Sequence, residues 1–373
     1  MNLEIEEDPD STLLHDIITG RIERDLLTVI SAAPASVNTL DGCGLAPIHW
    51  AVLNGFLDNR LASISLLLEN GADVNLQTKV GETALYLAVD IDLQEVFQLL
   101  LDAGAEVNTC TSYGYSPLMQ ASRRLELHLV ELLLKAGADP QQVDMNGDTA
   151  LHEFARSKFF DTKDTEDIAT LAHKLIKAGG QLEQRNYNGN TPLLYAAQSN
   201  NAEGFRVLYH LGARLNSDNG DRTVLHAAAH SGTWGLFTAL REAVPNLCVD
   251  PDLEDRRGET AVDELEWRIR LMELSEQDRA VETLYCNDVP LLSEEEINCF
   301  RELIHEIRVV HNFPKGRPRC RQGAVEVPMP GAWPSKVEEM EEESDDGEVE
   351  ANIGINDGGG DGDESWETAS ESA

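Results

Sequence analysis

A short glycine motif returns along this chain at a nearly constant interval. It reads Gly71-Ala72-Asp73-Val74 and is closed by Asn75. A fixed interval of about 33 residues is typical of a solenoid, in which one supersecondary unit is repeated and each copy packs only on its neighbours. Such chains usually present a surface rather than carry out chemistry. The later copies begin at Gly104, Gly137, Gly179 and Gly212, so that successive glycines are 33, 33, 42 and 33 residues apart.

A second motif runs in phase with the first, and Thr149-Ala150-Leu151-His152 and Thr191-Pro192-Leu193-Leu194 are good copies of it. Thr or Ser at its first position can cap a helix by accepting an orphan backbone N–H. Pro fits the first helical turn, and the glycine of the first motif suits a left-handed helix end. We therefore expect Gly104, Gly137 and Gly212 each to end an outer helix with positive φ. Further copies of the second motif begin at Ala46, Thr83, Ser116 and Thr223.

Together the two motifs resemble the ankyrin repeat, whose pattern is Gly, Thr-Pro-Leu-His, Ala-Ala, Leu-Leu and Gly-Ala. The resemblance covers roughly residues 40 to 265, or starts at about residue 10 if degenerate ends are counted. It implies an all-α solenoid of about six full repeats, built from helix-turn-helix and hairpin units. It also implies a non-enzymatic protein-protein interaction module, an adaptor or scaffold that binds another protein through its concave face.

Composition divides the chain into segments. Residues 276–311 are predicted to be a helical extension, and the acidic tail cannot bury enough apolar surface to become ordered. The polar face of Glu264, Glu266, Arg268 and Arg270 indicates a capping repeat before the extension. The other expected segments are a degenerate N-terminal capping repeat (1–39), ankyrin repeats (40–249), a degenerate C-terminal capping repeat (250–275), a Pro-rich basic linker (312–337) and a disordered acidic tail (338–373).

The extension should contain a helix from Glu294 to about His311. Ser293 and Glu296 form a capping-box pattern at its start. Its apolar face packs either on the closing repeat or on a partner protein. The face consists of Ile297, Phe300, Leu303, Ile304, Ile307 and Val310.

Two repeats carry extra residues, near 57–60 and within 157–165. Additional length is tolerated in a loop between helices. The second insertion is either drift in a permissive loop or an exposed site where Phe159 and Phe160 contact a partner.

Charge and cysteine usage limit the partners and the compartment. The chain holds 29 basic and 67 acidic residues, a net charge of −38. Such a field disfavours nucleic acid and anionic membranes and favours basic protein partners. The six cysteines are scattered, which suits the cytoplasm or nucleus. We expect a monomer with no small-molecule substrate, no cofactor and no membrane segment.

The sequence offers no catalytic or metal constellation. His49, His152 and His226 recur at one repeat position, so we expect them to hydrogen-bond neighbouring backbone. The Asn residues Asn75, Asn108 and Asn216 should likewise have a structural role in the hairpin turn. The stretch 144–148 resembles the opening of a calcium loop, but the Glu required at the twelfth position is replaced by Ala155. We predict neither metal binding nor enzymatic activity.

Repeat phase predicts which side chains form the binding surface. Aromatic residues and Arg usually dominate interface energetics. Some of these residues, Tyr195 above all, could instead pack between repeats. The predicted surface comprises Trp50, Tyr113, Tyr115, Gln120, Arg123, Glu153, Arg156, Tyr187, Tyr195, Gln198 and His230.

The segment 314–319, Pro-Lys-Gly-Arg-Pro-Arg, resembles the core of an AT-hook. In that family such a core lies in the narrow A·T minor groove, which would make Lys315, Arg317 and Arg319 DNA contacts. A nuclear-import patch and a plain basic linker are the other interpretations. Two alternative hypotheses for the function remain: a chromatin-associated protein that uses this core, and a chaperone for basic proteins that uses the acidic tail.

Overall fold

The computed structural model describes residues 13–18, 25–53, 60–91, 93–160, 164–215, 222–247, 249–273 and 290–311. All of them belong to the first of two compact units, Met1–Val327, and none to the second, Pro328–Ala373. The predicted basic linker and acidic tail, with Lys315, Arg317 and Arg319, therefore lie outside the described residues. Within the described ranges, no helix has both the length and the apolar character needed to cross a membrane.

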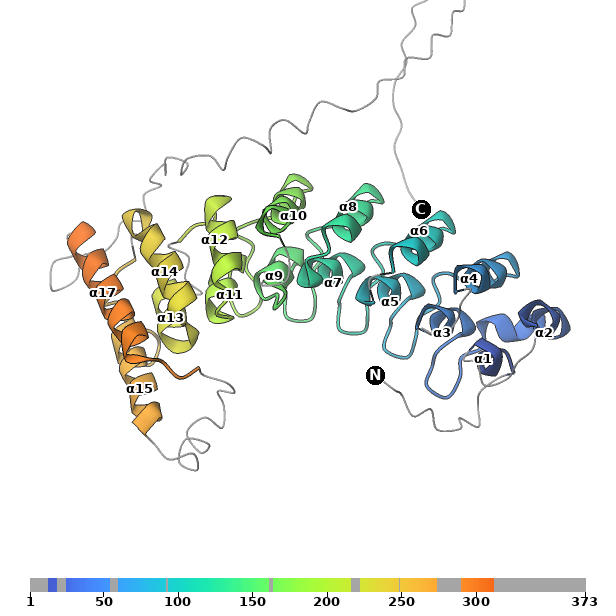
Figure 1. Cartoon of the computed structure of the whole chain (residues 1–373), viewed down its shortest axis with the longest axis horizontal. Coiled ribbons are helices and arrows are strands. Elements are labelled where there is room, and N and C mark those ends of the chain that lie inside the picture. The colour runs from blue at the N-terminus through green and yellow to red at the C-terminus, as the bar shows by residue number, and fades with distance from the viewer. Residues whose placement is uncertain are drawn as a thin grey trace, which may run out of the picture. The chain divides into compact units, whose positions relative to one another are not determined.

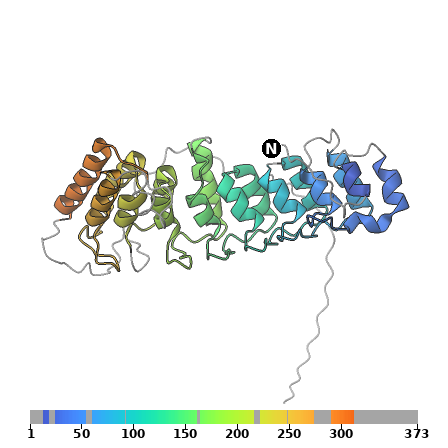
Figure 2. The same cartoon turned by 90° about the horizontal axis from the view of Figure 1, so that it is seen from below.

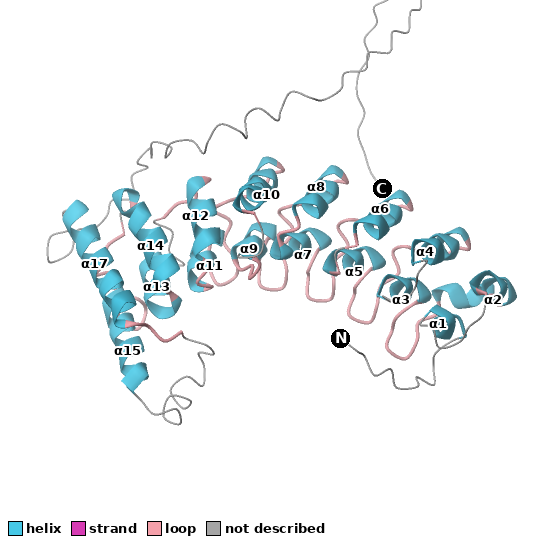
Figure 3. Cartoon of the chain, viewed as in Figure 1, coloured by secondary structure: helices cyan, strands magenta, loops and turns pink. Residues whose placement is uncertain are grey.

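Helices and connecting loops make up the described chain, apart from one isolated bridge between Gln77 and Thr83 (Figure 3). This confirms the predicted all-α ankyrin architecture. The helices are α1 (Leu13–Ile18), α2 (Leu26–Ala32), α3 (Pro47–Leu53), α4 (Arg60–Glu69), α5 (Ala84–Asp90), α6 (Gln94–Asp102), α7 (Pro117–Arg124), α8 (Leu127–Lys135), α9 (Ala150–Ala155), α10 (Thr165–Lys177), α11 (Pro192–Gln198), α12 (Ala202–His210), α13 (Val224–Ser231), α14 (Trp234–Ala243), α15 (Ala261–Glu273) and α17 (Glu294–Val310), with 3₁₀ turns η1 (Pro34–Asn38) and η3 (Val244–Asn246).

The helices form an inner and an outer row (Figure 1). Each inner helix packs on the next, in the order α1, α3, α5, α7, α9, α11, α13, α15. Outer helices also pack on one another, as in α8–α10–α12–α14–α17. Figure 2 shows the same succession of helices from below. Because each repeat touches only its neighbours, stability depends on nearest-neighbour contacts.

The recurring Thr or Ser starts the inner helices as predicted. Thr83, Ser116 and Thr191 are N-caps whose side-chain oxygens each accept the backbone N–H of the third residue of the helix. Pro117 and Pro192 occupy the first helical turn, where no N–H partner is lost.

The recurring histidines link one repeat to the next. The Nδ1 atom of His152 accepts the backbone N–H of Thr149 at 3.1 Å, and its Nε2 atom lies 3.0 Å from the carbonyl oxygen of Asn190. A ring bonded in this way must be neutral, with its proton on Nε2. Burial lowers the pKa of His49, His152 and His226, in keeping with this state. The predicted backbone role is thus confirmed, and His15 has the same role towards Leu45 at 3.0 Å.

The asparagines of the glycine motif bond the following repeat through its backbone. The side chain of Asn108 donates to the carbonyl of Gly137 at 3.1 Å and accepts the N–H of Asp139 at 2.9 Å. Asn75 makes the equivalent pair of bonds with Gly104 and Glu106. Their structural role is confirmed, while Asn216 lies outside the described residues.

The glycines that end the outer helices have the predicted backbone conformation. Gly104, Gly137 and Gly212 have φ values of 87°, 89° and 95°. Within the apolar triplets only the central leucines, Leu67, Leu100 and Leu133, are fully buried.

The two phenylalanines of the 157–165 insertion differ in their exposure to solvent. Phe160 is 7% exposed and packs edge-to-face on Phe154, with ring centroids 5.3 Å apart. Phe159 is 39% exposed and lies under the guanidinium of Arg124. The interpretation that both are exposed is therefore wrong for Phe160.

The closing helices differ from the sequence expectation in two respects, the burial of two charged residues and the exposure of Val310. Glu264 and Arg268, expected on a polar outer face, are buried with exposures of 2% and 1%. The helix from Glu294 and its Ser293–Glu296 capping box are confirmed. Its apolar face packs on α14 and η3, except that Val310 is 54% exposed at the helix end.

Because α15 packs on α13 while α17 packs on α14, these two helices continue the inner and outer rows. Phe300 of α17 lies 5.2 Å from Phe237 of α14, centroid to centroid. Arg241 of α14 forms ion pairs with Glu302 and Glu306 of α17. The apolar face of α17 is thus covered within the chain.

Candidate functional site

The tips of successive hairpins are joined by backbone hydrogen bonds. The N–H of Ser112 donates to the carbonyl of Val80 at 2.9 Å, and that of Met145 donates to Tyr113 at 3.0 Å. The N–H of Tyr187 then donates to Asn146 at 2.9 Å. These bonds hold four neighbouring hairpins in register.

Large apolar side chains are exposed at these tips. The exposed fractions are 44% for Val80, 61% for Tyr113, 67% for Met145 and 74% for Tyr187. We call these four residues the tip row. A series of exposed apolar groups on adjoining turns is typical of a protein-binding surface, because single exposed apolar residues are normally scattered.

A pocket of about 360 Å³ opens beside this row. Its walls include Tyr86 of α5 and the hairpin residues Tyr113 and Tyr115. Glu82 and Arg123 are its charged lining groups. Tyr115 is half-buried and packs against the core, so only part of its ring is available to a ligand.

The inner helices carry a diagonal series of contacts between repeats. Each joins the seventh residue after the capping position of one repeat to the fourth residue after that of the next. The Gln120 amide donates to Asp90 at 2.5 Å. The Arg123 guanidinium lies 3.9 Å from the Glu153 carboxylate. The remaining members are Arg156 over the ring of Tyr195 at 5.9 Å and His230 hydrogen-bonded to Glu264.

This diagonal series is interrupted at Gln198, because the next position is Ala227. The amide of Gln198 instead exchanges hydrogen bonds with Asn190 of its own repeat at 2.8 and 3.1 Å. Trp50 is likewise engaged, since its indole N–H donates to Asp41 at 2.6 Å. The polar inner-face residues therefore bond mainly to one another.

Glu153 lies beneath the predicted surface rather than on it. Its side chain is fully buried, and burial raises the pKa of Glu153 to about 7 despite Arg156 at 3.3 Å and Arg123 at 3.9 Å. Oxygen atoms of Glu153, Asp144 and Asp148 lie within 4.8 Å of one another. The arginines already supply positive charge there, and Asp144 is used by its own turn, accepting the N–H groups of Asn146 and Asp148.

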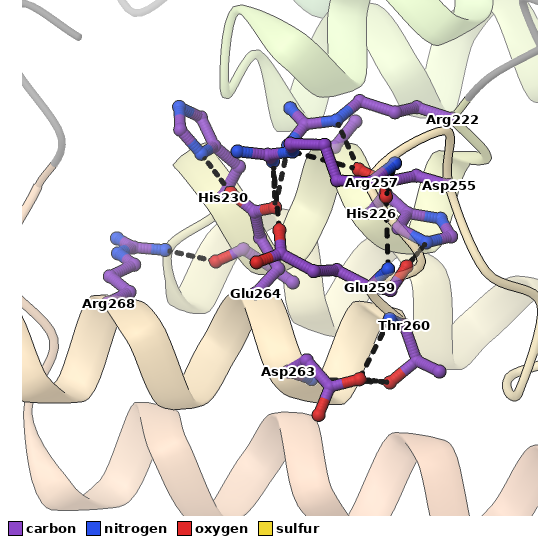
Figure 4. Close-up of polar contacts among 12 residues, drawn as sticks. Arg222, His226, His230, Asp255, Arg257, Glu259, Thr260, Asp263, Glu264 and Arg268 are labelled. Atoms are coloured by element: carbon purple, nitrogen blue, oxygen red, sulfur yellow. Dashed lines mark hydrogen bonds and ion pairs between the residues drawn. The ribbon is translucent and has the colours of Figure 1, made fainter.

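A second carboxylate cluster lies in the closing repeat (Figure 4). Glu264 receives hydrogen bonds from Arg222 at 2.6 Å, from Arg257 at 3.0 Å and from His230. Burial raises the pKa of Glu264, but these partners outweigh burial and hold it below its ordinary value. His230 also stacks on Trp267, with ring centroids 5.8 Å apart.

Arg268 crosses from α15 to the backbone of two other segments. Its guanidinium donates to the carbonyls of Ala229 at 3.2 Å, Gly232 at 2.7 Å and Pro290 at 2.7 and 2.9 Å. It thereby closes the C-terminal end of α13 and fixes the chain that leads into α17. Burial lowers the pKa of Arg268 to about 10.

Sequence reasoning found the tyrosines of the hairpins but missed other surface residues. Val80 and Met145 occupy hairpin turns adjoining those of Tyr113 and Tyr187, and the turn register would have identified them. The sequence could not identify Glu82 as a pocket residue, because the pocket forms only where two hairpins and two inner helices meet.

Comparison with known proteins agrees with this architecture. The family model of ankyrin repeats in three copies matches residues 17–111, 48–144, 92–171, 118–219 and 164–255, which together span more than half of the chain. This chain belongs to the ankyrin-repeat family. It is accordingly a protein-interaction module, built from repeats that associate with other proteins.

Three curated relatives share part of this ankyrin-repeat chain. NF-kappa-B inhibitor delta of Mus musculus is 35% identical over 125 residues, 32% of this chain and 36% of the relative. Probable E3 ubiquitin-protein ligase XBOS33 of Oryza sativa subsp. japonica is 40% identical over 78 residues, 21% of this chain and 14% of the relative. Putative glutaminase 2 of Caenorhabditis elegans is 42% identical over 74 residues, 20% of this chain and 12% of the relative. The matches span 36%, 14% and 12% of the three relatives, so this chain covers only part of each, and the three names describe different activities.

Proposed function

We propose that this ankyrin-repeat protein is a non-enzymatic adaptor or scaffold that holds a protein partner against its tip row and the adjoining inner helices. The observation that carries the proposal is the exposure of Val80, Tyr113, Met145 and Tyr187 on hairpins held in register. Tyrosine brings large contact area at a low cost in side-chain entropy. The bonded polar groups below the row give it a rigid base.

The test is partner binding by tip-row variants. We would isolate the native partner by affinity purification and then measure its binding to Tyr113→Ala and Tyr187→Ala proteins. Each substitution should weaken binding about tenfold or more, while the unfolding midpoint stays close to wild type because both rings are mostly exposed. Val309→Ala is a matched control, since Val309 is 64% exposed on α17. Normal binding by both tyrosine variants would reject the tip row as the interface.

A narrower candidate is that the partner is an NF-kappa-B protein, because the name of the mouse relative gives NF-kappa-B as its target. The 125-residue match supports this candidate, although it covers only a third of the chain. Titration of purified NF-kappa-B against the full chain tests it directly. Saturable binding that Tyr187→Ala weakens would support the candidate, and no binding would reject it.

A further inference from the structure

The side chain of Glu82 lines the pocket and has no polar partner among the residues that the structure describes. Glu82 is half-buried, and no hydrogen bond or ion pair reaches its side-chain oxygens from the described residues. Only its backbone is bonded, to Thr78. Burial and the nearby charge of Asp90 both raise the pKa of Glu82. A carboxylate in this setting lacks a counter-charge that a ligand could supply.

Two carboxylates and one guanidinium set the charge at and near the pocket. Glu82 of the first hairpin and Arg123 of α7 line it, and the carboxylate of Asp90 on α5 lies near enough to raise the pKa of both Glu82 and Tyr86. Burial raises the pKa of Tyr86, and the two carboxylates raise it further against the opposing effect of Arg123. Arg123 is in turn partly neutralised by the buried Glu153. The pocket is therefore complementary to a cation.

The aromatic walls suit the same ligand. A guanidinium or ammonium group is attracted to the face of a tyrosine ring within about 6 Å. The protein already contains this arrangement further along its inner helices, where Arg156 at the end of α9 lies 5.9 Å from the ring centre of Tyr195 on α11. Tyr113 and Tyr115 would offer equivalent ring faces to a side chain entering from outside.

We propose that this pocket binds an arginine or lysine side chain of the protein partner, with Glu82 as its ion-pair partner and Tyr113 and Tyr115 as its aromatic walls. The proposal rests on the proposed function, because the pocket adjoins the tip row. The contact would be made by a basic residue in the segment of the partner that crosses the first two hairpins of the tip row, residues 78–83 and 111–116.

The test uses three small probes of different charge, one of which keeps nearly the shape of arginine. Acetyl-arginine amide would be titrated into the full chain and followed by the NMR signals of the Gly81 and Gly114 amides. Acetyl-citrulline amide is the neutral control probe, and acetyl-glutamate amide tests the opposite charge. We expect saturable shifts with the arginine probe and weaker, non-saturating shifts with the other two.

Two variants assign the effect to one carboxylate. Glu82→Gln should weaken binding of the arginine probe about fivefold, because it removes a charge-assisted hydrogen bond. Glu95→Gln on the exposed side of α6 changes the net charge equally and should leave binding unchanged. Equal binding by citrulline, binding of glutamate through Arg123, or wild-type affinity in Glu82→Gln would each overturn the proposal.

The outcomes separate this proposal from the proposed function. If tip-row variants lose the native partner while Glu82→Gln binds the arginine probe normally, the surface stands and the pocket assignment fails. If the arginine probe depends on Glu82 but Tyr187→Ala, which lies outside the pocket, retains the partner, the pocket stands and the tip-row interface fails.

Discussion

Replacing Arg268 with methionine should destabilise the closing repeat specifically. The side chain is 1% exposed and donates to three backbone carbonyls, those of Ala229, Gly232 and Pro290. Methionine has a similar volume but donates no hydrogen bond, so these carbonyls remain buried without partners. At about 1 kcal/mol for each, the loss is about 3 kcal/mol. Burial of the guanidinium carries a desolvation cost, which also lowers the pKa of Arg268. The substitution removes this cost, so the loss of about 3 kcal/mol is an upper value.

The appropriate measurement is hydrogen exchange, because a solenoid opens locally and a global midpoint averages over repeats. Amides of α15 and α17 should exchange about 100-fold faster in Arg268→Met, while those of α5 to α9 should not change. Arg270→Met, an exposed change on the same helix, should stay within about 0.5 kcal/mol of wild type. If exchange in α15 and α17 is unaltered, the three carbonyl bonds do not stabilise the repeat and the reasoning is refuted.

Three further predictions concern the repeats. His152→Gln should lower stability and flatten the dependence of stability on pH. The folded-state pKa of His152 is depressed, so its contribution to stability is present above about pH 6.5 and is lost as the pH falls. Urea titrations between pH 8 and pH 5 would detect the difference. The folded-state pKa of Glu153 is raised to about 7, so its contribution to stability is complete below pH 4.5 and declines as pH rises through 7. Glu153→Gln should therefore remove a decline in stability with rising pH, and a variant with an unchanged slope would contradict this. Gly114→Ala should cost clearly more than Gly104→Ala in thermal unfolding: both have positive φ, but only at Gly114 would a Cβ meet backbone, 2.8 Å from the Cα of Asp144, and equal costs would disprove the argument.

Features that repeat locally could be predicted from the sequence. The caps at Thr83 and Ser116, the left-handed Gly104 and the backbone-bonded His152 follow from residue chemistry at one position of one unit. Their partners lie in the same or the adjoining repeat, so a single unit contains most of the information needed.

Contacts across irregular segments could not be predicted in this way. The position of α17 beside α14 depends on a partner that lies about 60 residues earlier, and spacing alone does not identify it. The burial of Glu264 and Arg268 has the same origin: their polar character suggested solvent, yet carbonyls and arginines from other segments surround them. The depth of Glu153 was missed because charged residues are rarely buried unless paired.

The asparagine bonds have a consequence for how such a chain can change in length. Asn75 and Asn108 make the same two bonds, each to the repeat that follows. Deletion of residues 76–108 would bring Asn75 against Gly137 and Asp139, a junction chemically identical to the one removed. Because the same two asparagine hydrogen bonds can form again, a whole repeat can be removed or added at this boundary. The number of hairpins in the tip row, and with it the length of the protein, can therefore change one repeat at a time.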